Sequence, residues 1–292
     1  MTIEFQRTIE RFQPDIVHAH LIRMAPYVGR TNGATILDLS DAVSLYLRRF
    51  KKSQKNIFFR FLIGTELLRV ERFERVLLQF DGAIMCSSVD AGFMQERIKN
   101  GKISIVNNGV DLNGLTSPRQ LLPDPVRIIF SGNMSYYPNA DGARFFASEI
   151  FPKIREEIPH AQLFIVGQEP PRSVRSLSSS DISVTGFVDD IHAEYLKSAV
   201  AVSPLRFGAG TPYKVLEPMA LGVPVVATSV GVEGLDFRGG KEILISDDPI
   251  SFAENVIYLL KNPSERAKIG RAAKRAVLKN HAIDAIGNHL IR

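Results

Sequence analysis

The sequence has a single cysteine and no long apolar run. Among its 292 residues only Cys86 is a cysteine, which excludes an internal disulfide and favours a reducing compartment. Its apolar surroundings predict a buried structural thiol rather than a nucleophile. No apolar stretch approaches the ~20 residues that a membrane-spanning helix needs, and the first residues lack the basic start and apolar core of a signal peptide. We therefore expect a cytoplasmic protein that is peripheral to the cytoplasmic membrane at most.

The sequence also lacks a strong excess of charge and any metal-site spacing. Its net charge is +5, which suits an anionic substrate or an anionic membrane face but is too small to indicate nucleic acid. No His, Cys and carboxylate residues are spaced as metal ligands are. We expect no metal and no cofactor.

Short apolar strands alternate with helical patterns along the whole chain. This order predicts an α/β fold with parallel sheets covered by helices. The expected strands are residues 15–20, 34–38, 82–86, 103–106, 126–130, 162–166, 182–184, 199–202, 224–227 and 242–245.

A proline-rich segment divides these strands into a group of four and a group of six. Residues 117–125 hold three prolines among polar residues, which is typical of a linker. We therefore predict a small, partial N-terminal Rossmann-like domain (1–116), this linker, a complete Rossmann-like domain (126–280) and a C-terminal tail (281–292).

One stretch of the second half has a pattern that indicates ligand binding. In Gly208-Ala209-Gly210-Thr211-Pro212-Tyr213-Lys214-Val215-Leu216-Glu217, a glycine-rich turn leads into a helix whose free N–H groups could bind phosphate. With a helix starting near Thr211, Lys214 and Glu217 lie one turn apart. Lys214 would face phosphates, and Glu217 would accept hydrogen bonds from a ribose diol. The alternative interpretations are a solvated helix face for the two charges and a tight turn for Gly208 and Gly210.

Several ordered motifs together resemble the retaining glycosyltransferases of family 4, in their bacterial polysaccharide-biosynthesis branch. They are residues 14–20, 108–111, 130–139, 166–167, 185–190, 203–206, 208–217 and 231–235. The resemblance implies a GT-B fold, in which two doubly wound Rossmann-type halves face a cleft. It also implies a hexosyltransferase that moves a sugar, with retention, from a nucleoside-diphosphate sugar to a polysaccharide or lipid-linked acceptor without a metal.

The resemblance assigns further site residues. It places His20 near the reacting carbon as the catalytic residue, Gly132 and Asn133 near the diphosphate or sugar, and Gly186, Phe187 and Val188 near the base, with Val215 in the 208–217 motif. We expect His18 and His20 to face opposite sides of their strand, so that one of them packs. A core histidine remains the alternative for His20, ordinary core for Phe187, and a helix N-cap for Asn139.

The chain departs from the family pattern in three places. The first of the two acidic residues of the family motif falls on Ala209, no cation lies within residues 131–139, and the N-terminal domain is shorter than usual. Two alternatives to an active transferase therefore stay open. One is a catalytically impaired nucleotide-binding module, and the other is a sugar-nucleotide epimerase of the same fold.

Cations and aromatic residues mix in residues 45–52 and 58–61. Such a surface could touch anionic lipid headgroups. A core-facing helix with solvated lysines is the slightly favoured alternative.

Overall fold

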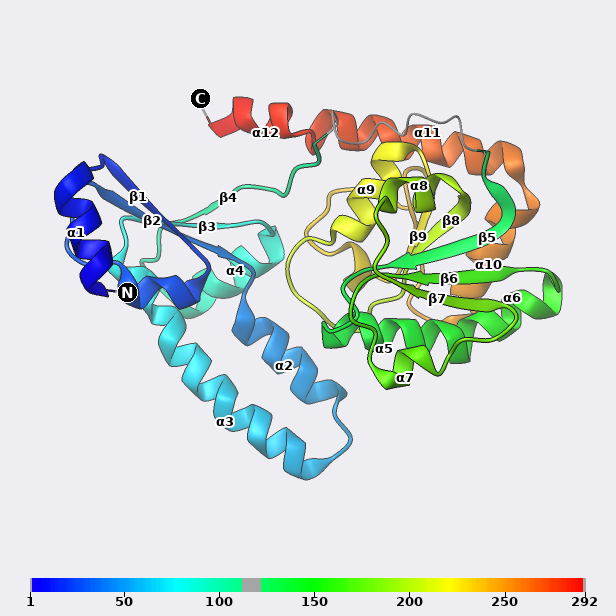
Figure 1. Cartoon of the computed structure of the whole chain (residues 1–292), viewed down its shortest axis with the longest axis horizontal. Coiled ribbons are helices and arrows are strands. Elements are labelled where there is room, and N and C mark those ends of the chain that lie inside the picture. Colours follow the sequence, from blue (N-terminus) through cyan, green and yellow to red (C-terminus); the bar gives the residue numbers. More distant parts are fainter. Residues whose placement is uncertain (1, 112–121, 291–292) are drawn as a thin grey trace. The chain divides into compact units, whose positions relative to one another are not determined.

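The computed structural model describes residues 2–111 and 122–290 (Figure 1). The chain forms two compact units. Unit 1 comprises Met1–Asn107 with Phe207–Thr211, and unit 2 comprises Asn108–Arg206 with Pro212–Arg292. A short segment of the second half of the sequence therefore belongs to unit 1.

Unit 2 is built on a six-stranded parallel sheet in the order β10-β9-β8-β5-β6-β7. The strands are β5 (Asp124–Ser131), β6 (Gln162–Val166), β7 (Ile182–Gly186), β8 (Ser198–Ser203), β9 (Val225–Ala227) and β10 (Leu244–Ile245). All six predicted strands are confirmed. The strand order reverses between β5 and β8, and the carboxyl ends of strands at such a reversal are where open α/β sheets bind ligands.

Helices cover both faces of this sheet. One apolar cluster joins it to helices α5, α6, α7 and α10, and a second joins it to α8, α9 and α11. Because both faces are covered, every residue of β8 is buried. The helices are α5 (Tyr137–Phe145), α6 (Phe151–Glu157), α7 (Arg172–Arg175), α8 (Ile191–Leu196), α9 (Tyr213–Leu221), α10 (Pro249–Lys261) and α11 (Pro263–Asn280), with a π-helical turn, Phe146–Ile150, between α5 and α6.

Helix α9 is fixed by a close backbone contact at its end. Gly222 closes it in the left-handed conformation, with φ of 85°. A Cβ on Gly270 of α11 would lie 2.1 Å from the carbonyl oxygen of Gly222. Only glycine allows this approach, so the two helices are held closely together.

Unit 1 has a four-stranded parallel sheet in sequential order, β1-β2-β3-β4. Its elements are β1 (Ile16–His20), β2 (Ala34–Ser40), β3 (Gly82–Met85), β4 (Ile103–Ile105), α1 (Thr2–Phe12), α2 (Val43–Ser53), α3 (Ile57–Phe73) and α4 (Ser88–Arg97), with 3₁₀ turns at Ile22–Tyr27 and Glu74–Gln79. The four predicted strands are confirmed. Cys86 is buried, and its thiol lies 2.8 Å from the carbonyl oxygen of Ser40. The predicted burial of the thiol is confirmed.

The units divide between Asn107 and Asn108, earlier than the predicted boundary at 116. The cause lies in the C-terminal helices, because the N–H of Val110 donates to the carbonyl oxygen of His281 at 2.8 Å and Val110 bridges to Ala282. Of the predicted linker 117–125, residues 117–121 lie outside the described residues and β5 already begins at Asp124. The predicted tail 281–292 includes a further helix, α12 (Ile283–Leu290).

Candidate functional site

Three neighbouring strands of unit 2 end in glycine. Gly132, Gly167 and Gly186 follow or close β5, β6 and β7, with φ of 153°, 148° and 73°. The N–H of Gly132 donates to Val166, and the N–H of Gly167 donates to Gly186, both at 3.0 Å. A Cβ on Gly167 would lie 1.8 Å from the carbonyl oxygen of Gly132. The strand ends are therefore stacked tightly and leave open backbone where a ligand could approach.

Lys214, in the first turn of α9, lies beside this glycine edge. A Cβ on Gly132 would lie 3.3 Å from Cε of Lys214. The side chain is half-buried, and among the described residues the structure gives its ammonium group no hydrogen bond or ion pair. Burial lowers the pKa of Lys214 to about 8, against the opposing effect of Glu217. The interpretation of Lys214 as part of a solvated helix face is therefore wrong, and the group remains mostly charged at neutral pH.

Glu217, one turn further along α9, is held by a buried tyrosine. The hydroxyl of Tyr195 donates to Oε2 of Glu217 at 3.4 Å and lies 2.5 Å from Oγ of Ser131. Burial raises the pKa of Glu217, while His192, Tyr195 and Lys214 act in the opposite direction. Tyr195 is 2% exposed, and burial raises its pKa. The carboxylate is thus half-buried and fixed in position, not a freely solvated group.

Tyr195 is not among the site residues predicted from the sequence. The sequence offers one indication of its role. Tyr195 lies at a buried position of α8, and a buried tyrosine hydroxyl needs a hydrogen-bond partner. No local motif identifies that partner, since Ser131 and Glu217 lie far away in sequence.

Asn133 and Asn139, which follow β5, both form side-chain hydrogen bonds within the protein. Oδ1 of Asn133 accepts hydrogen bonds from the N–H and the hydroxyl of Ser135, at 2.9 and 2.7 Å. Nδ2 of Asn139 donates to the carbonyl oxygen of Asn133 at 2.8 Å. Asn139 lies inside α5 and not at its N-cap, which is Tyr136, so the N-cap alternative is wrong. The helix begins at Tyr137, and Pro138 lies in its first turn. Oδ1 of Asn139 is buried without a partner among the described residues.

The residues predicted near the base differ in exposure. Phe187, after β7, is 71% exposed, so the alternative of an ordinary core residue is wrong. Val188 packs against the apolar cluster beneath α9, and Val215 is fully buried in it. The side chain of Val215 is therefore part of the core, and only its backbone could approach a ligand.

The glycine-rich segment before α9 is part of unit 1. The N–H of Gly210 donates to Oδ2 of Asp90 at 3.2 Å, the hydroxyl of Thr211 donates to the carbonyl oxygen of Cys86 at 2.9 Å, and Arg49 donates to the carbonyl oxygen of Gly208 at 2.9 Å. The N–H of Gly210 is therefore not available to a phosphate, because a carboxylate already binds it. Helix α9 begins at Tyr213, and its N-cap, Pro212, forms no side-chain cap.

His18 and His20 lie on the same, exposed face of β1. The expectation of opposite faces is wrong, because side chains alternate along a strand and residues two apart share a face. Nδ1 of His20 lies 3.1 Å from Oδ2 of Asp38 in β2, and Nε2 of His18 lies 3.6 Å from the same oxygen. Leu21, directly after His20, has φ of 70°, a strained value for leucine. His20 is therefore an exposed strand-end residue, and the core alternative is wrong.

Unit 1 also contains buried carboxylates that were not predicted from the sequence. Burial and the neighbouring charge of Asp90 raise the pKa of Asp41, directly after β2, to about 6. Asp90 accepts from the N–H of Ala42 at 2.9 Å as well as from Gly210. A single acid after a strand gives no sequence signal of burial, since burial comes from the fold around it.

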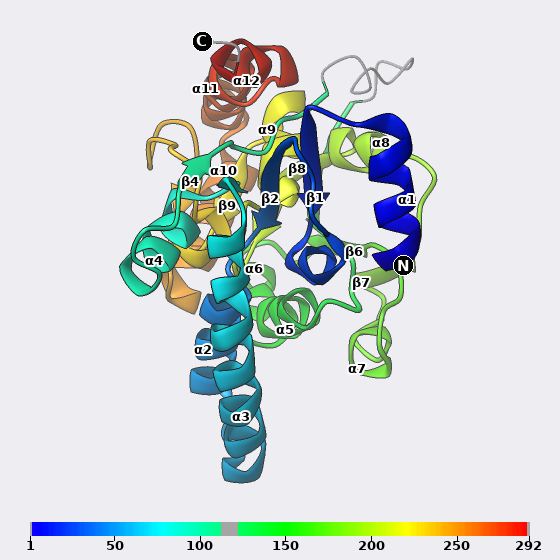
Figure 2. The ribbon, with the colours of Figure 1, turned by 90° about the vertical axis from the view of Figure 1, so that its left-hand side faces the viewer.

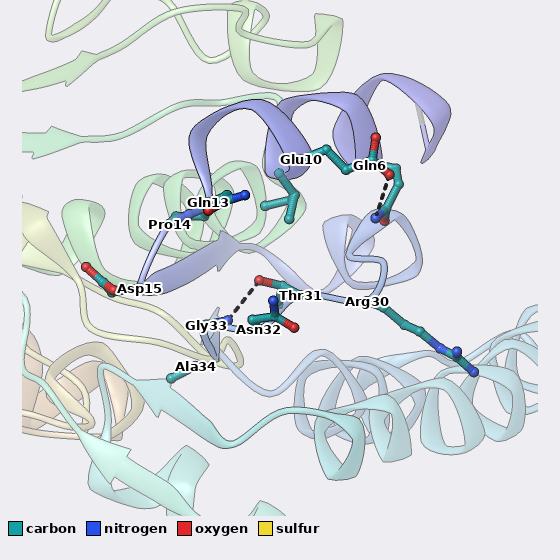
Figure 3. A pocket seen from close by; sticks show the side chains of 11 residues that line it. Gln6, Glu10, Gln13, Pro14, Asp15, Arg30, Thr31, Asn32, Gly33 and Ala34 are labelled. Carbon is teal, nitrogen blue, oxygen red and sulfur yellow. Dashed lines mark hydrogen bonds between the residues drawn. The ribbon is translucent and has the colours of Figure 1, made fainter.

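A cavity of about 830 Å³ opens at the other end of β1 and β2, at their amino-terminal ends (Figure 3). Its lining is mostly polar and includes one cation, Arg30. It is formed by Gln6, Ile9, Glu10, Gln13, Pro14, Asp15, Arg30, Thr31, Asn32, Gly33 and Ala34. Because ligands of α/β sheets bind at the carboxyl ends of strands, we do not place the functional site here.

The described part of the chain contains no group of three His, Cys, Asp or Glu residues able to hold a metal ion. Within residues 2–111 and 122–290, no helix has the length and apolarity to cross a bilayer.

Residues 125–262 match the model of the family Glycosyl transferases group 1. An uncharacterized 44.6 kDa protein in the cps region of Klebsiella pneumoniae is 26% identical over 163 residues, which are 53% of this chain and 42% of that protein.

Solved structures show the fold. TarM of S. aureus aligns with a TM-score of 0.80 and 12% identity over 99% of this chain and 57% of its own. Anabaena HepE, in complex with UDP and glucose, aligns with a TM-score of 0.74 and 14% identity over 98% of this chain and 79% of its own. The two Rossmann-like halves therefore have the GT-B fold, and residues 125–262 are a Glycosyl transferases group 1 domain.

Proposed function

We propose that the chain is a retaining, hexosyltransferase-type glycosyltransferase that transfers a sugar from a nucleoside-diphosphate sugar to a polysaccharide or lipid-linked acceptor. The observation that carries this proposal is Lys214, a half-buried cation without a partner among the described residues, beside the glycine-ended strands of unit 2. Keeping a cation partly out of water costs stability unless an anion binds it. A diphosphate is the anion that this edge of the sheet suits.

The leaving group of such a reaction is a nucleoside diphosphate, whose negative charge grows as the sugar bond breaks. Lys214 and the uncapped N-terminus of α9 would stabilise that charge, as an oxyanion hole does. This positive environment takes the place of a divalent metal in the proposal. The open backbone at Gly132 lets the phosphates approach closely.

Glu217 would hold the ribose. Its carboxylate accepts hydrogen bonds from a diol, and Tyr195, itself bonded to Ser131, fixes its orientation. Phe187 offers an exposed aromatic face to the base. In unit 1, Asp38 binds Nδ1 of His20, so a proton on Nδ1 leaves Nε2 as an acceptor at the proposed catalytic residue.

The comparisons support the proposal at a coarser level. The family match covers all of these unit 2 residues, from β5 to α9. Structures of HepE have been solved in complex with UDP and with UDP-glucose. UDP is therefore the first nucleotide to test.

Calorimetry with UDP tests the site. We expect the full chain to bind UDP and Glu217→Gln to bind it about 10- to 100-fold more weakly, as expected for loss of a charge-assisted hydrogen bond. The matched control is Glu254→Gln, an exposed acid of α10, with unchanged affinity. Equal affinities for Glu217→Gln and the parent chain would contradict the assignment.

The pH dependence tests the role of Tyr195. UDP affinity should fall as pH drops through the raised pKa of Glu217, because only the ionised form accepts both ribose hydroxyls. Tyr195→Phe removes a hydrogen bond that lowers this pKa, so the fall should move to higher pH. A purely structural tyrosine would leave the profile in place.

Incubation with UDP-glucose distinguishes the reaction classes. A transferase releases UDP when an acceptor is supplied, an epimerase yields a changed sugar nucleotide without an acceptor, and a binding module does neither.

A further inference from the structure

Helix α3 has an unusual environment. Its 17 residues include many apolar ones, yet none of them is buried. The exposed fractions at its N-terminal end are 83% for Ile57, 63% for Phe58 and 67% for Phe61. The alternative of a core-facing helix is therefore wrong for α3. In Figures 1 and 2, α3 lies beside α2, and both run away from the sheet of unit 1.

The segment from α2 to the first half of α3 carries charge of one sign only. Residues 42–65 contain no acid and six cations, which are Arg48, Arg49, Lys51, Lys52, Lys55 and Arg60. Arg48 is paired with Glu71, and Arg49 donates to Gly208. Lys52, Lys55 and Arg60 are exposed, and the structure gives them no acidic partner among the described residues. The apolar end of α3 is thus surrounded by unneutralised positive charge.

A groove of about 540 Å³ lies between α2 and α3. Five of the six cations line it, together with apolar side chains. The lining residues are Leu45, Arg48, Arg49, Lys51, Lys52, Arg60, Leu67 and Phe93. Such a lining suits a phosphate group that carries apolar chains.

We propose that the α2–α3 hairpin, residues 43–73, docks unit 1 on the surface of an anionic phospholipid bilayer. The apolar residues at the start of α3 enter the boundary between headgroups and acyl chains. Lys52, Lys55 and Arg60 contact lipid phosphates, and the groove between the helices receives a headgroup. The charge pattern decides for lipid over a protein partner, because an anionic bilayer attracts every cation of this segment at once while its interface accepts aromatic rings. The proposal is independent of nucleotide binding by unit 2.

Vesicle sedimentation of the full chain tests the docking. We expect binding to phosphatidylcholine vesicles containing about one third phosphatidylglycerol and little binding to pure phosphatidylcholine. Raising the salt from about 0.1 to 0.5 M should weaken binding, since it screens the attraction. Equal binding to both vesicle types, or none to either, would overturn the proposal.

Matched variants locate the surface. Lys52→Glu/Lys55→Glu/Arg60→Glu should weaken binding by at least about 100-fold, because each cation near an anionic surface contributes about a factor of five. The control, Lys274→Glu/Arg275→Glu/Lys279→Glu, changes the charge equally at exposed positions of α11 and should bind far better. Equal loss in both variants would show an effect of net charge alone and overturn the assignment to the hairpin.

Because the chain has no tryptophan, a single introduced tryptophan can report insertion into the bilayer. In Phe58→Trp the single indole should shift its emission to the blue and be quenched by brominated lipids when anionic vesicles are added. In the control Phe12→Trp, at an exposed position of α1, it should do neither. If Phe58→Ser/Phe61→Ser abolishes self-association in sedimentation velocity but leaves vesicle binding intact, the hairpin is an interface between copies and the proposal fails.

Discussion

Each unit has a partly buried ionisable side chain near the carboxyl ends of its strands, but the two side chains carry opposite charges. In unit 2 it is the cation Lys214, whose pKa burial lowers to about 8. In unit 1 it is the acid Asp41, whose pKa burial and Asp90 raise to about 6. Both shifts move the group toward its neutral form, which is how desolvation acts on either sign. The cation of unit 2 fits the anionic ligand that we propose, whereas this part of unit 1 binds hydrogen-bond donors such as the N–H of Gly210.

The two sheets also differ in their strand order. Unit 2 reverses its strand order between β5 and β8, whereas the four strands of unit 1 follow one another in sequence. A reversal separates neighbouring loops and opens a crevice at the strand ends. Lys214 and Gly132 lie at that kind of position, and Asp41 does not.

The largest effect is expected for Lys214→Met. UDP affinity should fall about 100-fold or more, as for removal of one partner from a desolvated charge pair. Stability should nevertheless rise by about 1–3 kcal/mol at pH 7, because the folded chain no longer keeps a cation partly out of water.

The sign of this stability change follows from the pKa. The pKa of Lys214 is about 8 when folded and near 10.4 when unfolded. The cost of the charge is thus fully present below pH 8 and fades as pH rises toward the unfolded value. Thermal unfolding at pH 7 and at about pH 10 should show a larger gain at the lower pH. A loss of both stability and affinity would mean that Lys214 is structural.

A second test compares glycines of the two units. Gly132→Ala should destabilise by about 1–3 kcal/mol, because φ of 153° strains an L-residue and the new Cβ would lie 2.7 Å from Nδ2 of Asn139. Gly82→Ala, at the start of β3, has no atom within 4 Å of the new Cβ, so its effect should stay within about 0.5 kcal/mol. Urea unfolding measures both. Equal tolerance would show that the strand end of unit 2 is not tightly packed.

Sequence patterns predicted the strands well and the side-chain environments poorly. All ten strands were found, because short apolar runs between helical patterns are a local signal. Tyr195, Asp41 and the bond from Gly210 to Asp90 join residues far apart in sequence, so no local pattern identifies them. The exposure of α3 reverses the usual rule that apolar residues are buried, and sequence alone could not tell a core helix from a surface one. The prediction that His18 and His20 face opposite sides of β1 was wrong for a reason visible in the sequence. The two residues are two positions apart, and such residues share one face of a strand.

The smallest effect is expected for Asp41→Asn in unit 1. The pKa of Asp41 is about 6 when folded and near 3.9 when unfolded, so the folded chain holds this proton more tightly. Stability from Asp41 is therefore full below the unfolded pKa and is lost as pH rises through 6. Asp41→Asn should raise stability by about 1 kcal/mol at pH 7.5 and by little at pH 4.5. The control Asp81→Asn should do the opposite, because the N–H and hydroxyl of Thr35 lower the pKa of Asp81, and its ionised form supports the fold at neutral pH. UDP affinity should be unchanged in both variants. A fall in UDP affinity for Asp41→Asn would show that the acid of unit 1 takes part in donor binding and would remove the contrast between the units.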